Sequence, residues 1–186
     1  MRHGQSKANV ENVIVSCLDN DHRGDYGLTY LGRQQALMAA AGSALSSDTV
    51  ICCSAFARAV QTAQIVGTAL GAADAVVSEA LRERCFGDWE GMSSDHYVAV
   101  WAADKASPDQ SARHVEPVSA VLARAAAFIV ALEQRYSGRD ILLVSHGDTL
   151  QILQAGFLRM NPGRHRDLPP FEPAEIRRFD LDHQVS

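Results

Sequence analysis

The chain has 186 residues and a mass of 20.1 kDa, and its 47% hydrophobic and 21% charged residues are typical of one globular domain over residues 1–186, not of a disordered or fibrous chain. Its 17 basic and 22 acidic residues give a net charge of -5, which argues against a broad nucleic-acid or anionic-membrane surface because both need clustered Lys and Arg. A local pocket for an anionic small molecule stays compatible with this balance.

The first predicted elements are a helix, a strand and a second helix. Thr29 is a candidate N-cap, and the apolar spacing after it predicts a helix to about Leu45. The β-branched run at residues 49–53 predicts a strand that leads into Ser54, another N-cap candidate. The Ala-, Val- and Ile-rich segment that follows predicts a helix ending at Gly71.

A second unit of strand, turn and helix occurs later in the chain. Residues 140–145 form a continuous apolar run, typical of a parallel strand covered on both faces, and His146-Gly147 leads from it into a predicted helix at 148–158. The segments between the two units are a short strand, a Gly- and Trp-containing loop and two helices, at residues 75–78, 81–91, 93–103 and 117–136. Alternation of this kind predicts an α/β fold.

The two ends of the chain are less regular. Four prolines precede an alternating segment at residues 175–181 that is compatible with an edge strand. At the start, Arg2-His3-Gly4 begins almost at residue one, so the first strand of the sheet is missing or truncated in this sequence. Because an absent central strand leaves backbone groups unpaired, we expect residues upstream of Met1, or another segment in that place.

Polar residues that can bind an anion occur in three places. Two follow predicted strand ends, Ser54 with Arg58 and Ser145-His146-Gly147, and the third is a polar Gly-containing turn, Arg2-His3-Gly4 with Ser6 and Asn9. In open α/β sheets these ends share one edge, so convergence predicts an anion site that contains a nucleophile. Taken singly, each has an ordinary alternative: a hydrogen-bonded histidine, a solvated helix arginine or a helix cap.

Five motifs, in order along the chain, are together far more specific than any one alone. They are Arg2-His3-Gly4 with Ser6 and Asn9; Leu28, Thr29, Gly32, Gln35 and Ala36; Ser54, Arg58, Gln61, Thr62 and Ala63; Leu81, Glu83, Arg84, Gly87, Trp89, Glu90 and Gly91; and Ser145-His146-Gly147. In these motifs the sequence resembles the histidine phosphatase, or phosphoglycerate-mutase-like, superfamily in its compact phosphatase branch. The resemblance implies a three-layer α/β/α domain with a mostly parallel central sheet.

The resemblance also implies roles for the site residues. His3 is the expected nucleophile, which forms a phosphohistidine that water hydrolyses. Arg2, Arg58 and His146 are expected to bind the phosphoryl oxygens, a task that suits the planar guanidinium fork of Arg. Neutral donors from Ser6 and Asn9 are expected beside them.

Glu83 is the expected general acid, which protonates the leaving group and then activates water. Burial and the bound phosphate would raise its pKa, whereas the neighbouring Arg82 and Arg84 would lower it, so the direction stays open at this point. We expect no metal and no other cofactor, because the arginines replace the cation and the remaining histidines show no tight ligand spacing.

The favoured activity is hydrolysis of a small phosphate ester, with a phosphoglycerate-mutase-type transfer as the alternative. Between Met92 and Val115 the chain has only Lys105 and Arg113 as fixed cations, whereas mutases of the family use an insertion with extra basic residues there. A segment around His114 also replaces the usual Pro-x-Gly-Glu-Ser element, so the leaving-group pocket differs. A catalytically silent module that binds a phosphorylated ligand is the alternative from another class.

The remaining expectations concern location and partners. Four cysteines, two of them adjacent in an apolar run, do not resemble a disulfide framework and favour a reducing cytoplasm. We expect no apolar stretch of the roughly 20 residues that a membrane span needs, and the N-terminus has no secretory h-region. The expected partner is a small-molecule phosphate ester, without nucleic acid or membrane, and the oligomeric state stays open.

Overall fold

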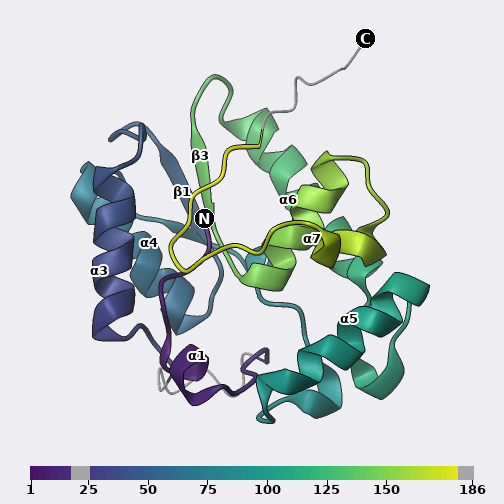
Figure 1. Cartoon of the computed structure of the whole chain (residues 1–186). Coiled ribbons are helices and arrows are strands. Elements are labelled where there is room, and N and C mark those ends of the chain that lie inside the picture. The colour runs from purple at the N-terminus through teal and green to yellow at the C-terminus, as the bar shows by residue number, and fades with distance from the viewer. Residues whose placement is uncertain (18–25, 180–186) are drawn as a thin grey trace.

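A computed structural model describes residues 1–17 and 26–179, and it contains helices on both sides of a parallel sheet (Figure 1). The helices are α1 (Lys7–Glu11), α3 (Tyr30–Ala41), α4 (Ala57–Leu70), α5 (Tyr97–Ala106), α6 (Val118–Arg135) and α7 (Gly147–Phe157). The strands are β1 (Val50–Cys53), β2 (Val76–Val77) and β3 (Ile141–Val144). Short 3-10 helices are η1 (Glu79–Leu81), η2 (Gly87–Trp89), η3 (Ser94–His96), η4 (Ala112–His114) and η5 (Pro162–Asp167).

The described strands form a parallel sheet in the order β2-β1-β3. Because side chains alternate along a strand, each face of the sheet buries a different set. One face, with Ile51 and Leu142, packs against α3 and α4, and the other, with Val50 and Cys52, packs against Leu132 of α6. Helix α7 packs on α6. The predicted α/β/α layers are therefore confirmed.

Residues Met1 to His3 lie beside β3, in the place of the expected first strand. Arg2 forms a parallel bridge with Ser145, and the backbone N–H of His3 donates to the Ser145 carbonyl at 3.0 Å. On the other side, Arg2 N–H donates to the Glu175 carbonyl at 3.1 Å, and Ala174 N–H donates to the His3 carbonyl at 3.2 Å. The Arg2-His3-Gly4 turn is thereby held at the carboxyl edge of the sheet.

Two local predictions are wrong. Ser54 does not cap α4, which begins at Ala57 after Phe56: its hydroxyl accepts from Phe56 N–H, which precedes the helix, and lies 2.8 Å from His146 Nε2. Residues 175–179 do not form an edge strand: their described backbone pairing is confined to the contacts of Glu175, and the prolines before them lack N–H donors. The rest of that predicted strand lies outside the described residues. The cap at Thr29 is confirmed, since its hydroxyl accepts from Gly32 N–H at 3.0 Å.

One segment corrects the expectation about apolar stretches. Residues Ala112–Arg135 contain a window with a mean hydropathy of 1.8. By length and composition alone, this segment could cross a membrane. Within the fold, this segment includes α6, which buries Val118, Val121 and Ala125 along one side and packs on α7. The core helix of a globular domain meets the same criterion.

Candidate active site

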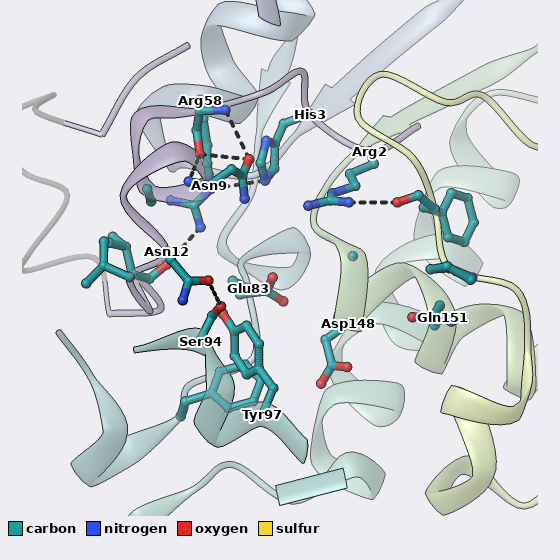
Figure 2. A pocket seen from close by; sticks show the side chains of 18 of the residues that line it. Arg2, His3, Asn9, Asn12, Arg58, Glu83, Ser94, Tyr97, Asp148 and Gln151 are labelled. Carbon is teal, nitrogen blue, oxygen red and sulfur yellow. Dashed lines mark hydrogen bonds between the residues drawn. The ribbon is translucent and has the colours of Figure 1, made fainter. Parts of the chain in front are cut away.

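The three predicted polar segments converge on one pocket of about 260 Å³ at the carboxyl edge of the sheet. Figure 2 shows Arg2, His3 and Arg58 on one side of it, with Glu83 facing them. The pocket is lined by Arg2, His3, Ser6, Ala8, Asn9, Asn12, Val13, Val15, Arg58, Glu83, Phe86, Ser94, Tyr97, Trp101, Gly147, Asp148, Gln151, Arg166, Pro170 and Phe171. His146 lies just behind this lining, with its ring centroid 5.2 Å from that of His3.

The tautomer of His3 follows from its contacts. Its Nδ1 lies 2.7 Å from the Gly4 carbonyl, an acceptor, so Nδ1 carries the proton and Nε2 has a lone pair. Burial, together with the Arg58 and Arg2 charges, holds the pKa of His3 well below its usual range. His3 therefore presents an unprotonated Nε2 to the pocket.

Arg58 is carried into the site by the first turn of α4. Its Nε donates to His3 Nε2 at 3.2 Å, and its Nη2 donates to the Val15 carbonyl at 2.9 Å. Thr62, one turn further along α4, accepts from Gly4 N–H at 3.1 Å and so ties the helix to the His3 turn. These bonds fix the arginine and the histidine relative to each other.

Arg2 contributes a second guanidinium, which is partly buried. Its Nη1 donates to the Phe171 carbonyl at 2.7 Å, as Figure 2 shows. Its Nε is buried and has no hydrogen-bond partner among the residues that the structure describes. A buried donor of this kind requires an acceptor, which an oxyanion supplies.

His146 follows β3 directly and also has a buried atom that lacks a partner in the described part of the chain. Its Nε2 lies 2.8 Å from the Ser54 hydroxyl, whereas its Nδ1 has no hydrogen-bond partner there. Burial and the Arg58 charge hold the pKa of His146 well below its usual range. The ring is therefore neutral, with one nitrogen available to a ligand.

Ser6 and Asn9 both belong to the cap of α1, but only Asn9 keeps a side-chain group that the cap does not use. They form a capping box at the start of α1, in which the Ser6 hydroxyl donates to Asn9 Oδ1 at 3.0 Å and accepts from Asn9 N–H. The Ser6 hydroxyl is thus occupied in the cap. The amide nitrogen of Asn9 is not used in the capping box, and the residue lines the pocket.

Glu83 is held in the pocket by two neighbours. One carboxylate oxygen accepts from Arg84 N–H at 2.9 Å and from the Thr149 hydroxyl at 3.2 Å. Burial, followed by the nearby Asp148 charge, raises the pKa of Glu83. This direction favours a protonated carboxyl, as a general acid needs.

The arginines on either side of Glu83 do not neutralise it, because each pairs with another carboxylate. Arg82 forms a bidentate pair with Glu116, at 2.6 and 2.7 Å. Arg84 is fully buried and forms a bidentate pair with Asp104, at 2.5 and 2.7 Å. The sequence left open whether the pKa of Glu83 is raised or lowered, and the direction in which the side chains of Arg82 and Arg84 point decides it.

Several lining residues were missed by the sequence analysis. They are Asn12, Ser94, Tyr97, Trp101, Asp148, Gln151 and Arg166. Two signals were available: Asp148 directly follows the Ser145-His146-Gly147 turn, and Tyr97 and Trp101 lie one helical turn apart. No sequence signal marked Arg166, which reaches the pocket from η5.

The two cations between Met92 and Val115 do not line the pocket. Lys105 pairs with Asp167 at 3.1 Å, and Arg113 lies 4.5 Å over the Trp89 ring. This segment therefore adds no cation to the site.

Known proteins are similar to this chain in sequence and in fold. The family model of the histidine phosphatase superfamily (branch 1) matches residues 1–185. A 2,3-bisphosphoglycerate-dependent phosphoglycerate mutase of Azorhizobium caulinodans is 32% identical over 174 residues, which cover 87% of this chain and 81% of the mutase. A glucosyl-3-phosphoglycerate phosphatase of Mycobacterium tuberculosis is 29% identical over 172 residues, covering 86% of this chain and 74% of that protein.

Solved structures agree with the sequence matches. A mycobacterial glucosyl-3-phosphoglycerate phosphatase in complex with VO3 superposes with a TM-score of 0.77 at 27% identity, covering 93% of this chain and 87% of its own. Bacillus stearothermophilus YhfR superposes with a TM-score of 0.76 at 26% identity, covering 100% of this chain and 95% of its own.

Proposed function

Because the chain belongs to branch 1 of the histidine phosphatase superfamily, we propose that it is a phosphomonoesterase that hydrolyses a small phosphorylated metabolite through a phosphohistidine on His3. The observation that carries this proposal is the state of His3, whose unprotonated Nε2 lies 3.2 Å from Arg58 Nε in a pocket that also contains Glu83. An in-line nucleophile, a cationic cradle and an acid are what phosphoryl transfer needs.

In the first step, His3 Nε2 attacks phosphorus while the ester P–O bond breaks. Arg2 and Arg58 offset the charge on the phosphoryl oxygens, and their role is supported by the unpartnered Arg2 Nε. The neutral His146 adds a hydrogen bond from its unpartnered Nδ1 when the Ser54 hydroxyl donates to its Nε2. The raised pKa of Glu83 supports its part as the acid that gives its proton to the leaving oxygen.

In the second step, the Glu83 carboxylate takes a proton from water, and the resulting hydroxide attacks phosphorus as the P–N bond breaks. Inorganic phosphate forms, and His3 Nε2 regains its lone pair. The Gly4 carbonyl keeps the Nδ1 proton of His3 in place through both steps, at 2.7 Å. Over the two steps Glu83 gives one proton to the leaving oxygen and takes one from water, so it returns to its starting state.

Phosphoglycerate-mutase-type transfer is the second candidate, supported by the Azorhizobium caulinodans relative. A mutase keeps water out and holds a second phosphate. Lys105 and Arg113 are directed elsewhere, which favours hydrolysis. Release of inorganic phosphate from a monoester, rather than an isomerised ester, decides between the two.

The deciding experiment traps the covalent intermediate. After rapid quench with radiolabelled p-nitrophenyl phosphate, we expect an acid-labile, base-stable label on the peptide that carries His3, and none in His3→Ala. Excess chelator should leave phosphate release unchanged. A label on serine or cysteine, or full turnover by His3→Ala, would contradict the mechanism, and ligand binding without any turnover would identify a silent binding module.

A further inference from the structure

Arg166 is a pocket cation that the two chemical steps above do not use. It comes from η5, near the end of the described chain, and lines the same pocket as His3 and Glu83. Its side chain is 28% exposed, so it is neither sealed in the core nor free in solvent. A guanidinium in this position has to be explained by what it contacts.

The guanidinium of Arg166 is held in place before any ligand arrives. It lies 3.8 Å over the Trp101 ring, a cation-π contact, and its Nη1 donates to Gln151 Oε1. Trp101 is fixed in turn, because its Nε1 donates to Asp148 at 3.0 Å and its ring stacks on Tyr97 at 5.3 Å. Binding to a fixed side chain costs less conformational entropy.

No described carboxylate forms a close ion pair with the Arg166 guanidinium. Its nearest carboxylate, Asp148, lies 3.9 Å from Nη1, beyond hydrogen-bond distance. That carboxylate already accepts hydrogen bonds at 3.0 to 3.3 Å from other donors, which are Trp101, His165 and Arg84. Among the described residues, Nε and Nη2 of Arg166 have no hydrogen-bond acceptor.

Arg166 lines the same pocket as Glu83, the proposed acid for the leaving oxygen, and it lies beside Asp148 and Gln151. Figure 2 shows Asp148 and Gln151 across the pocket from Asn9 and Asn12. In a guanidinium, Nε and Nη2 point the same way along one edge and can bind both oxygens of a carboxylate. A second phosphate would call for more cations, and Lys105 and Arg113 do not reach the pocket.

We propose that Arg166 binds a carboxylate on the leaving group and so selects phosphate esters of small hydroxy acids. This inference rests on the proposed hydrolysis of a phosphomonoester. Gln151 and Trp101 hold the guanidinium, and its Nε and Nη2 edge binds the ligand.

The test compares esters that differ only in the carboxylate. We expect the wild type to prefer 2-phosphoglycolate and 3-phosphoglycerate over 2-hydroxyethyl phosphate and glycerol 3-phosphate, respectively. Arg166→Gln should raise KM for each carboxylated ester about 10- to 100-fold more than it raises KM for the matched neutral ester, the loss typical of a charged hydrogen bond. Arg166→Lys should recover part of the loss, because it restores the charge without the planar fork.

Arg164→Gln is the matched control, since Arg164 belongs to the same η5 helix but pairs with Asp167 at 2.7 Å and does not line the pocket. We expect it to leave both members of each ester pair unchanged. Equal KM effects of Arg166→Gln on carboxylated and neutral esters, or no wild-type preference between them, would overturn the proposal.

A binding measurement separates this inference from the proposed function. If the wild type hydrolyses no ester at all, the proposed function fails, but calorimetric titration of 2-phosphoglycolate still compares His3→Ala with the double variant that adds Arg166→Gln. We expect the double variant to bind about 10-fold more weakly or worse. Equal affinities in that comparison would refute the role of Arg166.

Discussion

The protonation state of Glu83 depends on where its two neighbouring arginines are paired. Arg82 binds Glu116 and Arg84 binds Asp104, so neither guanidinium offsets the burial that raises the pKa of Glu83. A carboxyl in this environment stays protonated over a wider pH range than an exposed one. Its chemical role can therefore be tested by changing the leaving group.

We predict that Glu83→Gln slows alkyl phosphates about 100- to 10,000-fold, the usual size of a general acid-base contribution, but slows p-nitrophenyl phosphate much less. The reason is that an aryl leaving group needs little protonation. Steady-state rates of the two ester types measure the difference. In the wild type, the alkyl ester rate should also fall as pH rises through the raised pKa of Glu83.

Thr149→Val is an informative companion variant, because the Thr149 hydroxyl donates to the Glu83 carboxylate at 3.2 Å and steadies it without reacting. It should lower the alkyl ester rate by less than Glu83→Gln does. Equal losses for aryl and alkyl esters in Glu83→Gln would remove Glu83 from the acid role.

At the scale of elements, two glycines let the His3 turn pack against α3. A Cβ on Gly4 would lie 2.3 Å from the Gly32 carbonyl oxygen, and a Cβ on Gly32 would lie 2.0 Å from the Gln5 carbonyl oxygen. Both contacts involve backbone atoms, which cannot move aside as a flexible side chain does. The approach of α3 therefore sets the position of the turn that carries His3.

We predict that Gly32→Ala destabilises the protein by about 1–3 kcal/mol or more, the cost of overpacking, and lowers turnover because it displaces the backbone next to His3. Urea unfolding and p-nitrophenyl phosphate hydrolysis measure the two effects. Gly42→Ala is the control on the same helix: its φ is -89°, and its nearest contact would be 3.4 Å away. Similar small effects for both variants would show that the close approach is unimportant.

At the scale of the whole molecule, two neutral histidines are buried between charged arginines. His3 and His146 are 3% and 0% exposed, and burial holds both pKa values well below their usual range. The unfolded chain takes up protons at these histidines as pH falls below about 6.5, whereas the folded chain does not. Their stabilising contribution is therefore complete above that pH and is lost as pH falls toward their folded pKa values.

We predict that the free energy of unfolding decreases between pH 6 and pH 5, with each of these histidines contributing a slope of at most about 1.4 kcal/mol per pH unit. His3→Gln should reduce the pH dependence of the free energy of unfolding by the slope that His3 contributes, whatever the variant's stability at pH 7. Urea unfolding at several pH values measures the slopes. Parallel curves for the variant and the wild type would contradict the prediction.

The sequence by itself predicted the order of β1 to β3 and of α3 to α7, though not α1, and it indicated where the site segments could converge. The apolar runs at 49–53 and 140–145 are typical of buried strands, which the structure has at 50–53 and 141–144, and parallel strands bring their carboxyl ends to one edge. That rule places Arg58 and His146 beside His3 without any knowledge of side-chain contacts. Local polarity and periodicity were sufficient for these conclusions.

Only the tertiary structure decided the features that depend on side chains distant in sequence. The direction of the Glu83 pKa required knowing that Asp104 and Glu116 take the neighbouring arginines. Arg166 lies over the Trp101 ring because η5 packs on α5, which the sequence did not indicate. Charge and burial act through space, so a residue's electrostatic environment is set by the fold and not by its neighbours along the chain.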